Sequence, residues 1–226
     1  SDLGGEVYAT DELYLALEDY KETTDRPIYA YCASMAASGG YYLACSADKI
    51  LMNRNCMTGS IGVTAGTYID ISGFLEKQGI KTTSIYVGKN KTMGSYFEGF
   101  TDEQKKIYTD ILMETYDQFV QVVADGRGLT TEQVTALADG RIYSPKQAVA
   151  DKLADGIMTE KEAKAAMTKD NKLGDGITYI DYSPSTDITL SDLLGLLTEA
   201  KKTDLDSYLS AIKMPVNGPA YYYEGM

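Results

Sequence analysis

The spacing of hydrophobic positions in the first hundred residues changes several times between helical and extended patterns. Apolar residues recur every three or four positions from Leu13 to Tyr20, which predicts a helix over residues 10–23 capped at Thr10. The same reasoning predicts strands over 28–33, 49–52 and 81–87, a glycine-punctuated strand or turn over 58–63, and helices after Ser38 and over 68–78 with Gly79 as its end. Strands and helices that alternate at this length indicate βαβ units and an α/β fold.

From Thr101 onward the pattern becomes mostly helical. The predicted helices run over 101–126, from Thr130–Thr131, from Ser144–Pro145 and over 159–167, followed by a strand near 177–182, a helical pair over 190–212 and an aromatic tail over 218–226. We expect the tail to pack on the parent domain. The chain therefore divides into an α/β core carrying the candidate chemistry over 1–100 and a mostly helical segment over 101–226, packed together as one compact unit.

Composition excludes several classes of function. Of the 226 residues, 44% are hydrophobic and 24% charged, which is typical of a globular domain. The formal charge of −12 has no basic stretch to offset it, so we expect no nucleic-acid partner. No run of 18 apolar residues predicts a membrane span, and no cofactor is expected.

The first residues and the cysteines refine this picture. The chain starts with Ser1–Gly5, which reads as a loop around a glycine turn and not as a signal peptide, so we expect an upstream part that could carry a membrane anchor. Cys32, Cys45 and Cys56 sit in apolar surroundings. An odd, sparse set of this kind predicts buried thiols, not a disulfide framework or a metal site.

A serine flanked by small residues is the main candidate for chemistry. Ser38 follows an apolar, extended segment, precedes Gly39-Gly40 and is expected at a strand-to-helix corner that exposes its hydroxyl beside free backbone N–H groups. A small residue in a tight turn is the plainer interpretation of this motif. The chain has no histidine, so a Ser-His-Asp triad is impossible and lysine is the best remaining base.

Four short motifs occur in order along the chain and together resemble one family. They are Gly4-Gly5, Ser38-Gly39-Gly40, Thr58-Gly59-Ser60-Ile61-Gly62-Val63 and Lys89-Asn90-Lys91-Thr92-Met93-Gly94-Ser95. This set resembles the signal peptide peptidase A family, the S49-type serine/lysine proteases of the crotonase/Clp-like superfamily. The resemblance runs from Gly4 to about Gly156 and, more loosely, into 179–182 and 189–194.

The resemblance implies a fold and a role for each motif. The fold is a crotonase/Clp-like core of repeated ββα units with a helical C-terminal extension, from which the N-terminal strands are missing. By position in the motifs, Ser38 matches the nucleophile, Lys91 the general base and Ser60 the serine that holds the lysine amine. Gly5 and Gly39 match the two backbone N–H donors of the oxyanion hole.

Some positions depart from the family pattern. Asp2-Leu3 stands where the family usually has Ser-Pro, and Lys91-Thr92 stands where it usually has Lys-Asp. Residues 95–97 read Ser-Tyr-Phe in place of Ser-Pro-Phe. A lysine acts as a base only when burial favours its neutral form, and the absence of Asp and Glu from 87–96 is compatible with that. Lys89 is the rival base, since both lysines could project from one face of an extended segment.

The leading hypothesis is a serine endopeptidase that cleaves extended apolar peptides, such as remnant signal peptides, through an acyl-enzyme. A crotonase-like acyl-CoA enzyme and a non-catalytic scaffold of the same fold are the alternatives, while the missing histidine argues against a Clp-like protease. The resemblance also implies a ring- or dome-shaped homo-oligomer, in which serine and lysine can come from neighbouring subunits. It implies a bacterial membrane protein with its catalytic part outside the cytoplasm.

Overall fold

The computed structural model of the chain describes residues 4–174, 176–180 and 220–222. The chain forms two units, Ser1–Asn171 together with Gly218–Met226, and Lys172–Asn217. All helices and strands given below belong to the first unit. The helical pair expected over 190–212 lies outside the described residues, as do residues 181 and 182 of the late strand, and residues 177–180 do not form a strand.

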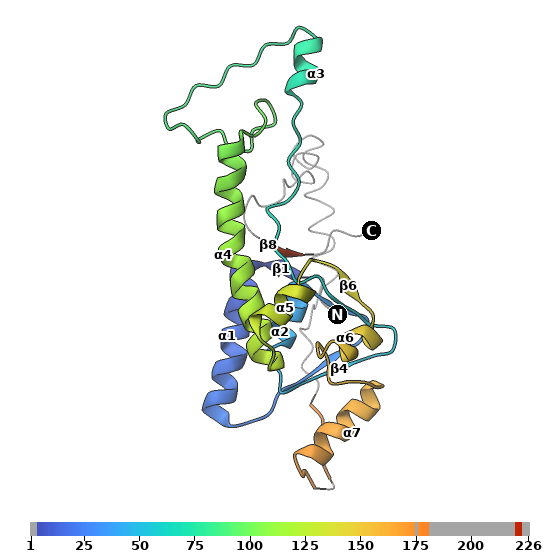
Figure 1. The fold of residues 1–226 in the computed structure, drawn as a ribbon. Coiled ribbons are helices and arrows are strands. Elements are labelled where there is room, and N and C mark those ends of the chain that lie inside the picture. Colours follow the sequence, from blue (N-terminus) through green and yellow to red (C-terminus); the bar gives the residue numbers. More distant parts are fainter. Residues whose placement is uncertain (1–3, 175, 181–219, 223–226) are drawn as a thin grey trace, which may run out of the picture. The chain divides into compact units, whose positions relative to one another are not determined.

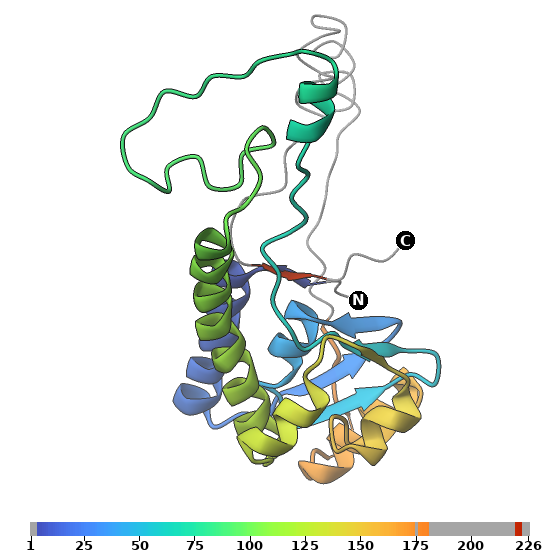
Figure 2. The same ribbon diagram turned by 45° about the horizontal axis from the view of Figure 1, so that its top comes forward.

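Three small sheets confirm the α/β class (Figures 1 and 2). The first holds parallel strands β2 (Tyr29–Cys32), β4 (Lys49–Met52) and β7 (Gly156–Ile157) in the order β2-β4-β7. The second holds β3 (Met35–Ala37), β5 (Met57–Gly59) and β6 (Ile142–Tyr143), with β5 parallel to β3 and antiparallel to β6. The third pairs β1 (Gly4–Glu6) with β8 (Ala220–Tyr222) antiparallel. The segment after residue 100 therefore contributes β6, β7 and β8 to these sheets.

Seven helices connect the strands within the described residues. They are α1 (Val7–Thr24), α2 (Gly39–Ala44), α3 (Ser72–Lys77), α4 (Asp102–Arg127), α5 (Thr131–Leu137), α6 (Pro145–Ala150) and α7 (Glu160–Asp170). The last four begin with reciprocal capping boxes at Thr101, Thr130, Ser144 and Thr159. The starts predicted from these capping residues are confirmed.

Several predicted boundaries are wrong, each for a physical reason. Thr10 is buried inside α1, which begins three residues earlier, and Gly4-Gly5 forms a strand instead of a turn because β8 pairs with it. The strand predicted over 28–33 ends at Cys32. The strand predicted over 81–87 is irregular and exposed, because none of the strands in the described residues pairs with it.

The helices α1, α2 and α4 enclose an aromatic core. Tyr42 of α2 is fully buried, with its ring centroid 5.2 Å from those of both Tyr14 and Phe119. Its hydroxyl donates to Asp11 Oδ1 at 2.5 Å and accepts from Gln118 Nε2 at 2.9 Å. Figures 1 and 2 show α1 and α4 side by side. This packing fixes α2, and with it the residue that precedes α2.

A partly buried ion pair between Arg127 and Asp155 ties the end of α4 to β4. Arg127 has a side chain only 6% exposed and donates to both oxygens of Asp155, at 2.8 and 3.0 Å. Asp155 Oδ2 also accepts the backbone N–H of Ile50 at 2.7 Å. Burial raises the pKa of Asp155, but the hydrogen bonds from Arg127 and Ile50 outweigh it and hold the pKa below its usual range.

Candidate active site

Ser38 occupies the corner between β3 and α2, as the sequence predicts. Its backbone is in the left-handed region, with φ of 55°, which is unfavourable for a residue other than glycine. Three hydrogen bonds hold the corner: the Ser38 N–H donates to the Gly59 carbonyl at 2.8 Å, and the Ser38 carbonyl accepts from Tyr41 N–H at 3.0 Å and Tyr42 N–H at 2.9 Å. A strained serine between a strand and a helix is the geometry of a nucleophile elbow.

The Ser38 hydroxyl is buried, contrary to the exposed hydroxyl expected from the sequence. The residue is 0% exposed, and its Oγ has no hydrogen-bond partner among the residues described. A buried hydroxyl without a partner is unfavourable, so such a group needs an explanation beyond packing. A hydroxyl that awaits a substrate or a base provides one.

Ser60 lies level with Ser38 at the ends of two paired strands. The register of β3 and β5 sets Ala37 opposite Gly59, so the two serines follow at adjacent strand ends. Adjacent strands lie about 4.8 Å apart. Ser60 also has a positive φ, of 49°, and its N–H donates to the Arg141 carbonyl at 2.7 Å. The structure thus brings together these two of the residues singled out from the sequence.

The two glycines singled out for their N–H groups lie on elements that touch. Gly39 is the first residue of α2, and the N–H groups of a helix's first turn have no acceptor within the helix. Gly5 is the central residue of β1, which contacts α2 and pairs with Tyr221 of β8. An oxyanion hole requires backbone donors beside the nucleophile, and of these two glycines Gly39 directly follows Ser38.

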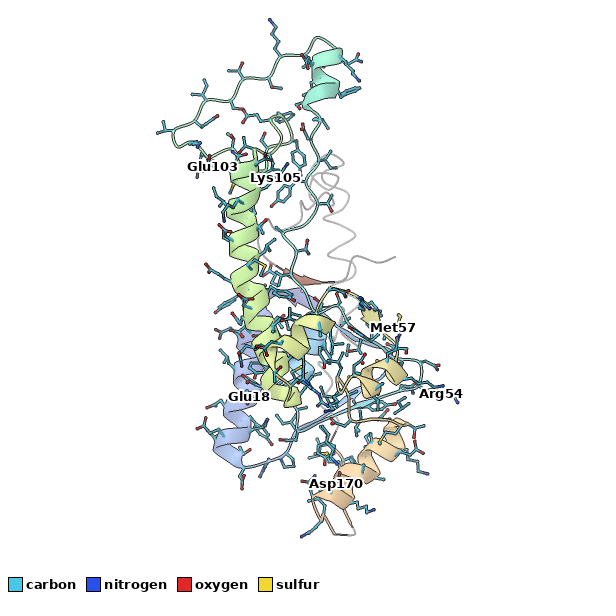
Figure 3. The ribbon with its side chains drawn as sticks, viewed as in Figure 1. Glu18, Arg54, Met57, Glu103, Lys105 and Asp170 are labelled. Carbon is cyan, nitrogen blue, oxygen red and sulfur yellow. The ribbon has the colours of Figure 1, made fainter. Side chains whose placement is uncertain are left out.

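The two candidate lysines lie on the long connection from β5 to α4. Both are exposed, and Lys89 forms an ion pair with Glu103, which lies at the N-terminal end of α4 (Figure 3). The Lys91 N–H donates to the Gly88 carbonyl at 3.0 Å in a turn. Since Ser38 Oγ has no partner in the described part of the chain, neither amine is bonded to it.

An aromatic cluster anchors this connection to α4. The rings of Tyr68, Phe100 and Tyr108 have centroids 4.9 to 5.7 Å apart. Gly94, three residues beyond Lys91, lies against this cluster with φ of 87°, and a Cβ there would lie 3.0 Å from the Tyr68 ring. The connection that carries Lys91 therefore packs against α4 through its aromatic residues, while Lys91 itself is exposed.

Two residues that shape the serine corner were missed from the sequence. The buried Thr58 hydroxyl donates to the Ala36 carbonyl at 2.6 Å and ties β5 to β3. The Tyr143 ring packs over Gly59, where a Cβ would lie 2.5 Å from Tyr143 Cδ2. Gly59 has φ of 93°, so its neighbours Thr58 and Ser60 depend on a conformation that favours glycine. The glycine of the Thr58-Gly59-Ser60 motif is the sequence signal from which the close approach of the Tyr143 ring could have been predicted.

An apolar pocket of about 300 Å³ lies beside the serine corner. It is lined by residues from α1, β2, β3 and α2, among them Met35 and Ala36 before Ser38 and Gly40 and Leu43 after it. No group of His, Cys, Asp and Glu side chains able to hold a metal occurs in the described residues. Within the same residues, no helix has the length and apolar character needed to cross a membrane.

Comparison with known proteins now identifies the family. The model of peptidase family S49 matches residues 21–174. The chain belongs to peptidase family S49. The family match and the protease names of the relatives together show that the chain belongs to a serine peptidase family. They confirm the family resemblance seen in the sequence motifs.

Individual relatives agree with this assignment. The protein named "Putative signal peptide peptidase SppA" of Enterococcus faecium is 36% identical over 231 residues, which cover 99% of this chain and 66% of that protein. "Putative protease MJ0651" of Methanocaldococcus jannaschii is 36% identical, covering 71% of the chain and 50% of the relative. "Serine protease SPPA, chloroplastic" of Arabidopsis thaliana is 28% identical over 84% of the chain and 28% of the relative.

The chain therefore spans at most about two thirds of these S49 relatives. Among solved structures, a peptidase of Plasmodium falciparum aligns with a TM-score of 0.37 at 13% identity, over 65% of this chain and 63% of that one.

Proposed function

We propose that the chain is a serine endopeptidase in which Ser38 is the nucleophile, Lys91 the general base and Ser60 the residue that holds the lysine amine. Ser38 Oγ attacks the peptide carbonyl while the neutral amine takes its proton. The amine component of the substrate then leaves with that proton, and water hydrolyses the remaining acyl-enzyme. The observation that carries the proposal is the buried Ser38 hydroxyl, which has no hydrogen-bond partner in the described part of the chain and lies at a strained strand-to-helix corner.

The oxyanion formed in this reaction would be bound by the N–H groups of Gly39 and Gly5. Gly39 directly follows Ser38, and the contact between β1 and α2 supports the participation of Gly5. Backbone donors of this kind contribute about 3 to 4 kcal/mol each to the stability of the transition state. They require no side chain, which suits a chain that has no histidine.

We propose extended, apolar peptides, such as remnant signal peptides, as the substrates. The pocket beside the serine corner supports this, because apolar residues from β2, β3 and α2 line it and it is large enough for a hydrophobic side chain. The name of the Enterococcus faecium relative points to the same class of peptide.

The base is proposed to come from a neighbouring subunit of a ring- or dome-shaped homo-oligomer. Ser38 is buried while Lys91 is exposed, and the connection that carries Lys91 exposes many large apolar side chains to solvent. These are Ile69, Phe74, Ile80, Ile85, Tyr86, Val87 and Phe97. An apolar surface of this extent on one segment is typical of an interface. Packing against a second copy would bury Lys91 and favour its neutral form.

The remaining part of the proposal concerns location and partners. We propose a bacterial, membrane-associated protein whose catalytic part faces away from the cytoplasm, with peptides and further copies of itself as its partners. The signal peptide peptidase name of the bacterial relative supports this. The net charge of −12 leaves nucleic acid unfavoured as a partner.

A set of single substitutions tests the dyad. Ser38→Ala and Lys91→Ala should each abolish hydrolysis of an uncharged apolar peptide, whereas Lys89→Ala should retain most of it. Circular dichroism of each variant checks that the fold is unchanged. An active Ser38→Ala variant, or an inactive Lys89→Ala beside an active Lys91→Ala, would contradict the assignment.

Mixing the two inactive variants tests whether the site is shared. If serine and lysine come from neighbouring subunits, a mixture of Ser38→Ala and Lys91→Ala forms some interfaces with both groups intact. We expect such a mixture to recover a fraction of the wild-type rate after subunit exchange. A mixture that stays inactive while subunits demonstrably exchange would show that the pair acts within one chain.

A further inference from the structure

One peptide group connects the serine corner to the hairpin that contains β6. It is the peptide between Gly59 and Ser60, whose carbonyl accepts the Ser38 N–H at 2.8 Å. Its own N–H, that of Ser60, donates to the Arg141 carbonyl at 2.7 Å. The orientation of this group fixes the direction in which the Ser60 side chain leaves the backbone. The hairpin therefore controls where the Ser60 hydroxyl lies relative to Ser38.

The backbone on both sides of this peptide is in an unfavourable conformation. Gly59 has φ of 93°, and Ser60 has φ of 49°. A residue other than glycine adopts the left-handed region only where its surroundings impose it. The hairpin continues to hold the chain after Ser60, because the Gly140 N–H donates to the Ile61 carbonyl at 3.1 Å. The constraint on Ser60 thus comes from the residues around β6.

Tyr143 of β6 covers this peptide. The antiparallel register of β5 and β6 sets Tyr143 opposite Thr58, one residue before Gly59. Tyr143 is 5% exposed. A Cβ on Gly59 would lie 2.5 Å from Tyr143 Cδ2 and 2.7 Å from the Arg141 carbonyl oxygen. The ring and the carbonyl therefore fill the space beside Gly59 and restrict rotation of its peptide.

The ring is anchored at its far end. The Tyr143 hydroxyl donates to the carbonyl of Leu137, the last residue of α5, at 2.7 Å. Burial, only partly offset by Arg141, raises the pKa of Tyr143 above its usual range. The hydroxyl therefore remains a donor at neutral and moderately alkaline pH. The anchor persists under the conditions in which a lysine base would act.

We propose that Tyr143 is a positioning residue of the peptidase: its anchored ring holds the Gly59–Ser60 peptide so that the Ser60 hydroxyl lies level with Ser38 and can hold the amine of the base. This inference rests on the proposed function, since Ser60 has this role only if a lysine is the base. Tyr143 acts through Ser60 and takes no part in making or breaking bonds. Its loss should slow acylation without weakening substrate binding, because Tyr143 is not among the residues that line the apolar pocket.

Tyr116 provides a matched control. It lies on α4, and its hydroxyl donates to the carbonyl of Ala138, the residue after Leu137, at 2.9 Å. Tyr116→Phe and Tyr143→Phe therefore remove the same kind of donor from two adjacent carbonyls. Of these two rings, that of Tyr143 is the one placed against Gly59. Circular dichroism and urea unfolding check that both variants fold.

The test compares both variants with the wild-type chain of 226 residues. Hydrolysis of an uncharged apolar peptide gives KM and kcat, and fluorophosphonate labelling at Ser38 gives the reactivity of the nucleophile. The kcat is expressed per labelled site, so that an inactive fraction does not enter. For Tyr143→Phe we expect kcat and the labelling rate to fall about tenfold or more, with KM changed by less than about twofold. Tyr116→Phe should match the wild type in all three quantities.

A double variant tests whether the effect passes through Ser60. Ser60→Ala should slow labelling at least as much as Tyr143→Phe does. Adding Tyr143→Phe to Ser60→Ala should cause no further fall, because the side chain that Tyr143 positions is already gone.

Several results would overturn the inference. These are a wild-type kcat and labelling rate in Tyr143→Phe, an equal loss in Tyr116→Phe, and a raised KM at unchanged kcat. A further fall when Tyr143→Phe is added to Ser60→Ala would show an effect that does not involve Ser60. All of these are compared with a wild-type chain that is labelled at Ser38. A folded wild-type chain without that label would refute the proposed function itself, and the positioning role with it.

Discussion

The cross-strand bond from Thr58 offers a sharp test of how the serine corner is held. The Thr58 side chain is fully buried, and its Oγ1 donates to the Ala36 carbonyl at 2.6 Å. Ala36 and Thr58 are register partners, two residues before Ser38 and Ser60. Thr58→Val keeps the volume and branching of the side chain and removes only the donor. The substitution therefore probes the hydrogen bond without opening a cavity.

The expected loss follows from the burial of this bond. The register of β3 and β5 still gives the Ala36 carbonyl the ladder bond from the Gly59 N–H, so the substitution removes one buried hydrogen bond and should lower the free energy of unfolding by about 1 kcal/mol. In a protein of this size the matching fall in Tm is about 2 to 4 °C. Because the register of β3 against β5 brings Ser38 level with Ser60, kcat/KM should fall as well. Urea unfolding and the hydrolysis of an uncharged peptide measure the two effects.

Thr23→Val is the matched control. Thr23 also donates through Oγ1 to a backbone carbonyl, that of Asp19 at 2.7 Å, but on the exposed face of α1. The same chemical change there should alter the free energy of unfolding by less than about 0.5 kcal/mol. A Thr58→Val variant with wild-type stability, or a Thr23→Val variant that loses as much, would refute the reasoning.

Three further predictions follow from other contacts. Gly126→Ala should lower the free energy of unfolding, measured in urea, by at least about 2 kcal/mol, because the new Cβ would lie 2.2 Å from the Cys45 carbonyl oxygen. Gly73→Ala in α3, where the new Cβ would meet open space, should leave this free energy unchanged. Equal effects of the two substitutions would contradict this. Arg127 helps to hold the pKa of Asp155 below its usual range, so the ionised carboxylate stabilises the fold above roughly pH 4, and this stabilisation is lost as the pH falls through the lowered pKa. In Asp155→Asn the free energy of unfolding should therefore fall less steeply as the pH is lowered. An unchanged slope would contradict this. Specific activity should fall on dilution if subunits share the site, and light scattering that shows a fully active monomer would exclude sharing.

Local signals in the sequence predicted much of the fold correctly. Capping residues such as Thr101 and Ser144 mark helix starts because their side chains bond the first backbone N–H groups, an interaction that needs no distant partner. The strand 49–52 and the Ser38 corner were likewise predicted, because a run of apolar residues followed by small ones specifies both.

The errors involve pairing between distant segments. Gly5 lies in a strand because residues 220–222 pair with it, whereas residues 81–87 are irregular because no strand among the described residues pairs with them. The burial of the Ser38 hydroxyl and the support from Thr58 depend on a register that no local pattern encodes. Lys91 could be proposed from its motif alone, but its exposure follows from the long connection that carries it.

The central claim, that Ser38 is the nucleophile, is tested most directly by covalent labelling. The chain is treated with a fluorophosphonate, which reacts with activated serines, and the adduct is located by mass mapping after digestion. We predict a single adduct on Ser38, absent from the Ser38→Ala variant and strongly reduced in Lys91→Ala. An adduct on another serine, or no adduct on a folded protein that hydrolyses peptides, would contradict the account.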